Sequence, residues 1–240
     1  MKKGNKRNKN AGYDRFLLSD DISNGIIEAY KEIRTNLLYM PFDVKCKRIV
    51  VTSSIAREGK TITSINIAIS LAQLGLKVLL IDADMRASLV KKYLDISVKG
   101  GLSECLAGIE RAKILKNIKK LGNVDLLLAG ELPPNPSELL MSERMHELME
   151  LLAEDYDYII IDTPPVNVVT DATTLIQESE GYLLVVRDDY SDVNGVQKAV
   201  EKLSKLGANI CGIVMNDVKK TGNRDRYYSY KDYYNDGYYY

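Results

Sequence analysis

A lysine and a threonine end a short polar stretch that follows the first strongly apolar run of the chain. The stretch SSIAREGKT (53–61) separates an apolar run at 47–53 from a segment with helical periodicity at 61–74. In such a setting, backbone N–H groups and a helix N-terminus bind phosphate, the lysine reaches the β- and γ-phosphates, and the threonine hydroxyl ligates Mg²⁺. Ser54 occupies the position of the first glycine of the common P-loop pattern. The pattern therefore predicts a binding site for ATP or GTP with Mg²⁺.

Three aspartates end two other apolar runs. Asp82 and Asp84 close the stretch LLIDADMR, and Asp162 closes IIIDTPP. A carboxylate at the end of a buried strand is costly unless a cation lies beside it. Each aspartate could instead cap a helix, and the spacing alone leaves both interpretations open. Beside a P-loop, the three acids are better explained by Mg²⁺ and by a nucleophile that has to be activated.

The apolar runs have the length of strands and alternate with segments of helical periodicity. Because the runs lack in/out alternation, they are typical of parallel strands covered on both faces. The order predicts an α/β fold with a doubly wound, mostly parallel sheet, whose ligands bind at the carboxyl ends of the strands. We expect strands at 47–53, 77–83, 124–130, 157–163, 181–187 and 208–216, and helices at 22–39, 61–74, 137–153 and 192–206, with Gly75 and Gly207 as C-caps and Asn135-Pro136 as a helix start.

Composition narrows the class of protein. A chain of 240 residues is long enough for one sizeable α/β domain. Its formal net charge of zero favours neither nucleic acid nor an acidic partner. The three cysteines are far apart and form no CxxC pair, which indicates a reduced, cytosolic protein. No apolar run approaches the roughly 18 residues of a membrane helix.

Both ends of the chain differ from its middle. The basic stretch MKKGNKRNKN predicts a flexible, solvated arm at 1–20, with a weak anchor on anionic lipid as the alternative, at about 1 kcal/mol per basic residue. From about Lys219 the apolar pattern stops, which predicts a disordered tail at 219–240. Of the 16 tyrosines in the chain, the tail holds eight: Tyr227, Tyr228, Tyr230, Tyr233, Tyr234, Tyr238, Tyr239 and Tyr240.

In their order, these motifs resemble the cytoplasmic kinase of the bacterial tyrosine kinase (BY-kinase) family, associated with capsular and exopolysaccharide synthesis. VTSSIAREGKT is similar to the Walker A motif of the family, VLLIDADMR to its distinctive Walker A′ motif, and YIIIDTPPVNVVTDA to its Walker B motif. The similarity runs from about Asp21 to Val218, and the tyrosine tail completes it. It implies a P-loop NTPase fold of the MinD/ParA type and a kinase domain at 21–218.

The resemblance also implies roles for the residues. Lys60 and the loop amides would hold the phosphates of ATP, while Thr61, Asp84 and Asp162 would organise Mg²⁺. The sequence alone does not separate Asp82 from Asp84 as the base that accepts the tyrosine proton, and the resemblance favours Asp82. The implied catalytic residues are Asp82, Lys60 and Asp84. The implied nucleotide-binding residues are Ser54, Ala56, Arg57, Glu58, Gly59, Lys60, Thr61, Ile62 and, near the adenine, Asn216.

The sequence departs from the family pattern at several positions. Ala56-Arg57 stand where the family usually has Pro-Gly before EGK, which removes the conformational freedom of a glycine. The proline and histidine that commonly follow the Walker A′ motif are absent from ASLVKKY. EAYKEIR is similar to the ExxRxxR motif of ring assembly, with Lys31 in place of an arginine that could form a bidentate fork. Glu28, Lys31 and Arg34 share one face of the expected helix, and a solvated charged face is the alternative reading.

The implied function is ATP-dependent phosphorylation of the tail tyrosines in trans, within a homo-oligomeric ring for which an octamer is one candidate size. Such phosphorylation would regulate capsular or exopolysaccharide synthesis and export. The implied partners are a membrane-bound activator of the polysaccharide chain-length or co-polymerase type and a tyrosine phosphatase, and nucleic acid is not among them. The chain would then be cytoplasmic and recruited to the inner face of the cell membrane.

Two other functions compete with this interpretation. A positioning ATPase of the MinD/ParA kind would carry an early signature lysine in a KGGxGKT arrangement, whereas Ile55, Ala56 and Arg57 stand at the corresponding positions here. A nucleotide-binding scaffold with little kinase activity would bind ATP and oligomerise while its tail docked partners. Loss of tail phosphorylation on Asp82→Asn substitution would exclude the scaffold.

Overall fold

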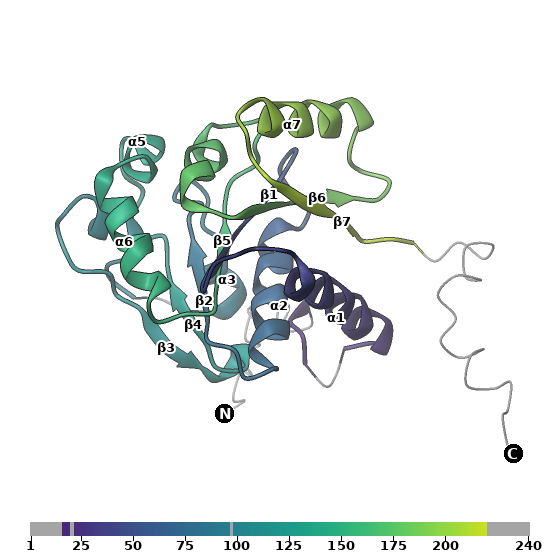
Figure 1. Ribbon diagram of the computed structural model, residues 1–240, viewed down its shortest axis with the longest axis horizontal. Coiled ribbons are helices and arrows are strands. Elements are labelled where there is room, and N and C mark those ends of the chain that lie inside the picture. Colours follow the sequence, from purple (N-terminus) through teal and green to yellow (C-terminus); the bar gives the residue numbers. More distant parts are fainter. Residues whose placement is uncertain (1–15, 20–21, 97, 220–240) are drawn as a thin grey trace, which may run out of the picture.

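The computed structural model describes residues 16–19, 22–96 and 98–219, and Figure 1 shows a central sheet between two layers of helices. The strands are β1 (Lys47–Ser53), β2 (Val78–Asp82), β3 (Leu115–Ile118), β4 (Val124–Leu127), β5 (Tyr158–Asp162), β6 (Gly181–Arg187) and β7 (Ile210–Asn216). They form a seven-stranded sheet in the order β3-β4-β2-β5-β1-β6-β7. Every neighbouring pair is parallel except β3 and β4. The predicted doubly wound, mostly parallel sheet is confirmed.

The helices form one layer on each face of the sheet. One face is covered by α1 (Asn24–Tyr39), α2 (Lys60–Ala72), α3 (Val90–Leu94) and the 3₁₀ helix η2 (Lys119–Leu121). The other face is covered by α4 (Leu102–Leu106), α5 (Pro136–Leu140), α6 (Glu143–Ala153), η3 (Asp171–Glu178) and α7 (Val193–Lys205). Of the helices in the described ranges, none combines the length and apolar character that crossing a bilayer requires.

The central strands contribute side chains to both layers. Along β1, Ile49 and Val51 pack toward α2, while Val50 packs toward the layer of α6 and α7. All residues of β2 and β5 are buried. An apolar strand buried on both faces cannot alternate with polar residues, which explains why these runs are continuous in the sequence. Their apolar burial is the main stabilising term of the domain.

The edge strand β3 and the division of one helix differ from the sequence-based expectation. The short edge strand β3 was not predicted, because its residues LKNI lack an apolar run and its middle residues Lys116 and Asn117 are exposed. The helix expected at 137–153 is divided into α5 and α6. At the division, the Ser142 hydroxyl donates to the carbonyl oxygen of Leu139 at 2.7 Å and accepts from the backbone N–H of Met145. A serine that bonds to the backbone in this way begins a new helix.

The two glycines predicted as C-caps lie one or two residues beyond the caps, which are Gln73 for α2 and Leu206 for α7. Gly75 follows α2 with φ 80° and Gly207 follows α7 with φ 81°, in the left-handed conformation that favours glycine. Pro136 is the first residue of α5, as predicted. The Asn135 side chain, however, does not cap the backbone of that helix and instead donates to Glu138 Oε2 at 2.5 Å.

Candidate functional site

The P-loop connects β1 to α2, so that the loop lies at the carboxyl end of a central strand. Gly59 ends the loop with φ 95°, and a Cβ atom at this position would meet the Nδ2 atom of Asn216. Only glycine therefore fits this turn. No side chain caps the N-terminus of α2, which begins at Lys60. The first N–H groups of this 13-residue helix, together with its dipole, form a ready site for an anion.

A buried carboxylate holds the P-loop together from within. Glu58 is fully buried and accepts hydrogen bonds from the backbone N–H of Ile55 at 2.8 Å and the hydroxyl of Ser54 at 2.9 Å. It also accepts from the hydroxyl of Ser191, in the loop after β6. The side chains of Ser54 and Glu58, both expected to bind nucleotide, thus bond to each other and fix the loop.

Residues at the ends of β6 and β7 hold the P-loop from outside. Tyr190 Oη donates to the carbonyl oxygen of Ala56 at 3.3 Å, and Arg187 Nη1 donates to that of Arg57 at 3.5 Å. Asn216 Nδ2 donates to the carbonyl oxygen of Glu58 at 2.9 Å. Because these donors bind carbonyl oxygens, they leave the loop amides for an anion, except the Ile55 amide, which donates to Glu58. Arg57 has φ 68°, a left-handed conformation that disfavours any residue with a side chain.

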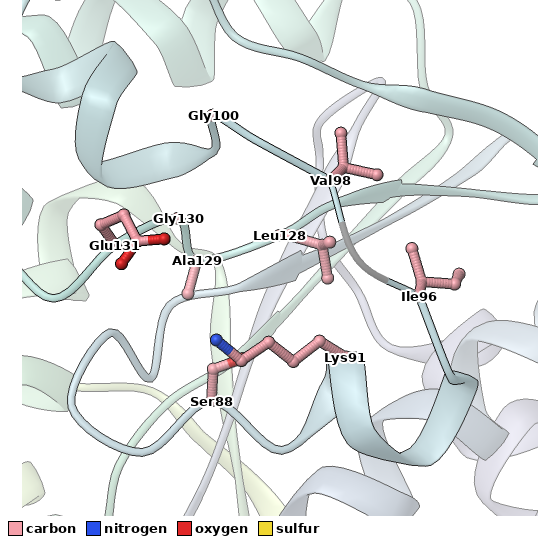
Figure 2. Close-up of a pocket in the computed structure, with 9 residues that line it drawn as sticks. All are labelled: Ser88, Lys91, Ile96, Val98, Gly100, Leu128, Ala129, Gly130 and Glu131. Atoms are coloured by element: carbon pink, nitrogen blue, oxygen red, sulfur yellow. The ribbon is translucent and has the colours of Figure 1, made fainter. Parts of the chain in front are cut away.

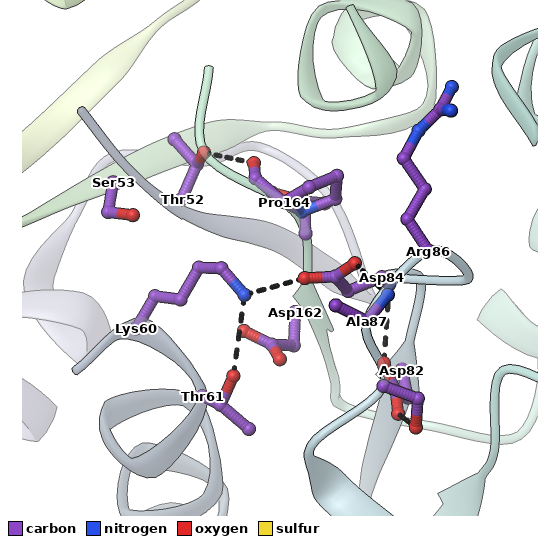
Figure 3. Close-up of polar contacts among 12 residues, drawn as sticks. Thr52, Ser53, Lys60, Thr61, Asp82, Asp84, Arg86, Ala87, Asp162 and Pro164 are labelled. Atoms are coloured by element: carbon purple, nitrogen blue, oxygen red, sulfur yellow. Dashed lines mark hydrogen bonds and ion pairs between the residues drawn. The ribbon is translucent and has the colours of Figure 1, made fainter. Parts of the chain in front are cut away.

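Lys60 bonds to an aspartate of the second motif. Its Nζ lies 2.8 Å from Asp84 Oδ2 and 3.4 Å from Thr61 Oγ1, and both charged side chains are almost fully buried (Figure 3). Burial alone would lower the pKa of Lys60, but the neighbouring carboxylates of Asp162 and Asp84 outweigh it and raise the pKa. Lys60 is therefore a stable cation at the centre of the predicted acids.

Two further carboxylates lie side by side on adjacent strands. Asp82 on β2 pairs in register with Asp162 on β5, and both are fully buried. Burial, together with the charge of Asp162, raises the pKa of Asp82 to about 8. Burial also raises the pKa of Asp162, against the effect of Lys60. Proximity and burial thus make Asp82 a group that can hold a proton near neutral pH.

Serine hydroxyls orient these carboxylates. Asp82 Oδ2 accepts from Ser88 Oγ at 2.5 Å, and Asp82 Oδ1 accepts from the backbone N–H of Asp84 at 3.2 Å. Asp162 Oδ1 accepts from Ser64 Oγ at 3.1 Å. Neither serine was identified from the sequence. Ser64 lies one helical turn after Lys60, which is a signal that could have found it. Ser88 lies in the stretch where the family commonly has a proline.

The donor set fits Mg²⁺. Asp162 Oδ2 is buried without a hydrogen-bond partner among the described residues, which is the state expected of an oxygen that serves a cation or its water shell. Thr61 supplies a hydroxyl and Asp84 a second carboxylate nearby. Within the described ranges, no three His, Cys, Asp or Glu side chains form a complete metal cage. Mg²⁺ commonly takes only one or two carboxylates and completes its shell with phosphates and water.

An ion pair that the sequence did not reveal anchors the loop after Asp84. Arg86 Nε lies 2.8 Å from Asp171 Oδ2, and Arg86 Nη2 lies 3.0 Å from Asp171 Oδ1. Ser137 Oγ on α5 donates to the same carboxylate at 2.6 Å. Figure 3 shows that Arg86 points away from Lys60. The bidentate pair fixes the loop between Asp84 and Ser88 to α5 and η3.

The other predicted residues lie away from this cluster or outside the described residues. Ile62, in the first turn of α2, is partly buried. On α1, Lys31 Nζ lies 2.7 Å from Glu28 Oε1, whereas Arg34 Nη1 donates to the carbonyl oxygen of Ser70 on α2 at 2.8 Å. The three residues of the expected assembly motif thus make contacts within one chain. The eight tail tyrosines and residues 1–15 of the arm lie outside the described residues.

Comparison with known proteins identifies the family. Residues 46–213 match the model of the AAA domain family. The chain is 35% identical over 213 residues to a putative tyrosine-protein kinase, CapB of Staphylococcus aureus, covering 88% of this chain and 92% of CapB. It is 37% identical over 209 residues to the tyrosine-protein kinase YwqD of Bacillus subtilis, covering 85% and 87%. The tyrosine-protein kinase Etk of Escherichia coli is 35% identical over 206 residues, which are 85% of this chain but 28% of Etk.

Solved structures agree with this assignment. The chimerical protein CapA2B2 superposes with a TM-score of 0.80 at 32% identity, covering 86% of this chain and 91% of that one. The kinase domain of Escherichia coli Etk superposes with a TM-score of 0.74 at 34% identity, covering 81% and 78%. MinD of Pyrococcus horikoshii, solved with Mg-ADP, is 23% identical with a TM-score of 0.61 and shares the fold. The MinD/ParA alternative is not favoured, and the chain belongs to the family of bacterial tyrosine-protein kinases.

Proposed function

We propose that this chain uses ATP and Mg²⁺ to phosphorylate the tyrosines of its own C-terminal tail in trans. The observation that supports this most is the buried cluster in which Lys60 lies beside Asp84 while Asp82 and Asp162 end the neighbouring strands. A cation, two magnesium-type carboxylates and a separate base are the parts that phosphoryl transfer to a hydroxyl requires.

Nucleotide binding would exchange the partner of Lys60. The phosphates of ATP compete with Asp84 for the Lys60 amine, since both are anions. When Lys60 moves to the phosphates, the Asp84 carboxylate becomes available, together with Thr61 and the free oxygen of Asp162. Mg²⁺ held there would neutralise charge on the phosphates. The loop bonds made by Glu58 and Asn216 would keep the amides in place during this exchange.

Asp82 is the better candidate for the base. A tyrosine hydroxyl has a pKa near 10 and is a poor nucleophile until a base takes its proton. Asp84 is bonded to Lys60, whereas Asp82 contacts Ser88 and the backbone of Asp84. In its deprotonated form, Asp82 would accept the proton at Oδ2 as the tyrosine oxygen attacks the γ-phosphorus and the bond between that phosphorus and the leaving ADP oxygen breaks.

The tail starts at the same edge of the sheet as the site. Because β7 is parallel to β6 and β6 is parallel to β1, Asn216 ends at the edge that carries the P-loop. Lys219 Nζ lies 2.9 Å from Asp189 Oδ2, in the loop after β6. A flexible coil of about 22 residues, as expected for 219–240, would span roughly 25 Å, which suffices to reach a neighbouring subunit.

We further propose a ring assembled through α1 and regulated by the tail. Each phosphate adds about −1.5 to −2 charges, so a phosphorylated tail would be repelled by the acidic site and by its neighbours, and the ring would come apart. By family resemblance, the chain would be cytoplasmic, and an activator of the polysaccharide co-polymerase type would recruit it to the inner face of the membrane. A tyrosine phosphatase would remove the phosphates. The cycle would control capsular or exopolysaccharide export.

The first test is phosphorylation of the tail. The full chain is incubated with Mg·ATP, and phosphotyrosine at 227–240 is mapped by mass spectrometry, with Lys60→Met as the control. We expect phosphate on the tail of the parent chain and none on the variant. Phosphate that persists in Lys60→Met would contradict the proposal. Light scattering then compares the oligomer mass of the phosphorylated chain with that of the unphosphorylated chain. An equal mass would contradict ring disassembly.

A further inference from the structure

A small pocket lies beside the candidate base, on the side away from the P-loop. Its volume is about 70 Å³, and its lining includes Ser88, Lys91, Gly130 and Glu131 (Figure 2). We call these four residues and the space between them the Lys91 pocket. Ser88 and Lys91 follow β2, while Gly130 and Glu131 follow β4. The pocket therefore lies at the carboxyl ends of two adjacent strands, where α/β sheets bind ligands.

Ser88 connects this pocket to Asp82. Ser88 lines the pocket, and its hydroxyl donates to Asp82 Oδ2 at 2.5 Å. The strand order β1-β5-β2-β4 sets the P-loop on one side of Asp82 and the Lys91 pocket on the other. In phosphoryl transfer, the attacking and leaving oxygens lie roughly in line on opposite sides of the phosphorus. With ATP on the β1 side, the acceptor tyrosine approaches from the β4 side, past this pocket.

The wall of the pocket after β4 is held in a fixed shape. Gly130 has φ 85°, and the Glu131 backbone N–H donates to Glu104 Oε1 on α4 at 3.0 Å. The backbone N–H of Ser103 donates to the carbonyl oxygen of Ala129 at 3.0 Å. Although burial opposes it, bonding to backbone N–H groups and to the Ser103 hydroxyl lowers the pKa of Glu104. This carboxylate stays charged and keeps the wall in place.

The size and charge of the pocket select a short polar group. A cavity of about 150 Å³ accommodates benzene, so a pocket of 70 Å³ is too small for a tyrosine ring. In Figure 2 the Lys91 side chain runs into the pocket and directs its amine toward the end that holds Ser88, Ala129 and Glu131. A carboxylate can pair with that amine. The Glu131 carboxylate also lines the pocket and disfavours a ligand that brings more than one acid.

The tail sequence places a carboxylate one or two residues before several of its tyrosines. Asp225 precedes Tyr227 by two residues, Asp232 directly precedes Tyr233, and Asp236 precedes Tyr238 by two residues. Arg226 and Lys231 stand beside the first two aspartates, so that these flanks carry one acid and one base each. Such flanks match a pocket with one lysine and one glutamate. Four tail tyrosines have no acid at either of the two preceding positions: Tyr228, Tyr230, Tyr239 and Tyr240.

We propose that the Lys91 pocket is an acceptor subsite that binds the aspartate one or two residues before the tyrosine to be phosphorylated. Lys91 is then a specificity-determining residue, and the occupant is the tail segment 225–240 of a copy of this chain. The inference rests on the proposed kinase function and adds a substrate preference to it. The four tail tyrosines without such an aspartate, Tyr228, Tyr230, Tyr239 and Tyr240, are then phosphorylated more slowly than the other four.

The test uses the full chain and two synthetic peptides of residues 229–236. Both carry Tyr230→Phe and Tyr234→Phe, which leave Tyr233 as the single acceptor, and one also carries Asp232→Asn. An exposed ion pair contributes about 0.2–1 kcal/mol, so kcat/KM is expected to be roughly 1.4- to 5-fold higher for the aspartate peptide. In the Lys91→Glu variant the asparagine peptide is expected to be the better substrate. Lys92→Glu, a charge reversal next to the pocket but outside its lining, is expected to keep the parent preference.

The outcomes separate this inference from the proposed function. Phosphorylation of both peptides at equal kcat/KM, or an equal change in Lys91→Glu and Lys92→Glu, would overturn the subsite and leave the kinase function standing. No phosphate on any peptide or on the tail would overturn both. A preference that reverses only in Lys91→Glu, with Tyr228, Tyr230, Tyr239 and Tyr240 the slower tyrosines in the intact tail, would support the proposal.

Discussion

Arg57 is the residue at which the P-loop conformation conflicts most clearly with the side chain. Its φ of 68° lies in the left-handed region, and the residue is exposed. A non-glycine residue in this conformation costs about 1–2 kcal/mol. Glycine would remove that strain but would lose about 0.5–1 kcal/mol through the greater freedom of the unfolded chain. Arg57→Gly is therefore expected to stabilise the protein by about 0.5–1 kcal/mol.

The neighbouring Ala56 provides the matched control. It is equally exposed but has no positive φ, so Ala56→Gly has only the entropic loss and is expected to destabilise by about 0.5–1 kcal/mol. The difference between the two glycine variants isolates the strain at Arg57, at about 1–2 kcal/mol. In a domain of this size, each kcal/mol shifts Tm by about 2–4 °C.

Thermal unfolding of the three proteins without nucleotide measures both effects. Arg57→Gly is expected to raise Tm by about 1–4 °C, and Ala56→Gly to lower it by a similar amount. Circular dichroism at a single pH and salt concentration is sufficient. If the two glycine variants unfold at the same temperature, the left-handed conformation of Arg57 is not strained relative to the conformation of Ala56.

Three further predictions concern the site. Asp82→Asn is expected to abolish tail phosphorylation and to raise Tm in the absence of nucleotide, with a gap that widens from pH 4 toward pH 8. The folded-state pKa of Asp82 is raised to about 8, so between pH 4 and pH 8 the folded protein binds more protons than the unfolded one and loses stability as pH rises. A difference in Tm that does not depend on pH would contradict this. Gly59→Ala is expected to destabilise the protein by about 2–4 kcal/mol, because residue 59 has φ 95° and its new Cβ atom would meet Asn216. In a denaturant titration, Asn216→Ala in the same chain is expected to recover part of that loss. Arg34→Ala removes the hydrogen bond from α1 to the Ser70 carbonyl oxygen. If the same titration shows that the monomer loses about 1–3 kcal/mol of unfolding free energy, Arg34 stabilises the subunit itself. An unchanged stability with a reduced oligomer mass would instead assign Arg34 to assembly.

Much of the sheet was predictable because its central strands have a simple physical signature. β1, β2 and β5 are apolar on both faces, so their sequences are continuous apolar runs that end at the P-loop or at an aspartate. β3 lacks that signature because it lies at the edge and pairs on one side only. The break between α5 and α6 depends on a single serine hydroxyl that competes for the backbone, and helical periodicity continues across it.

Site residues that belong to a sequence motif were predictable. Contacts between loops that are far apart in the chain were not. Lys60, Asp82, Asp84 and Asp162 end strands or begin a helix, and the parallel sheet brings such positions together. The bond of Glu58 to Ser191 joins residues 133 apart in the chain, and no local pattern encodes it. The same holds for the pair of Arg86 with Asp171, 85 residues apart. Serine and arginine are too common for their type alone to mark such contacts.

The strand order has a consequence for the synthesis of the chain. β1 is made first but lies between β5 and β6, and its register partner for Lys47 is Tyr158, 111 residues later. At 5–20 residues per second, a ribosome needs about 6–22 seconds to make that interval. During this time the apolar segment of β1 has neither neighbour in the sheet, and its unpaired edges are open to other chains. The nascent chain is thus most exposed to aggregation, and to capture by chaperones, before the strands that complete its nucleotide loop have been made.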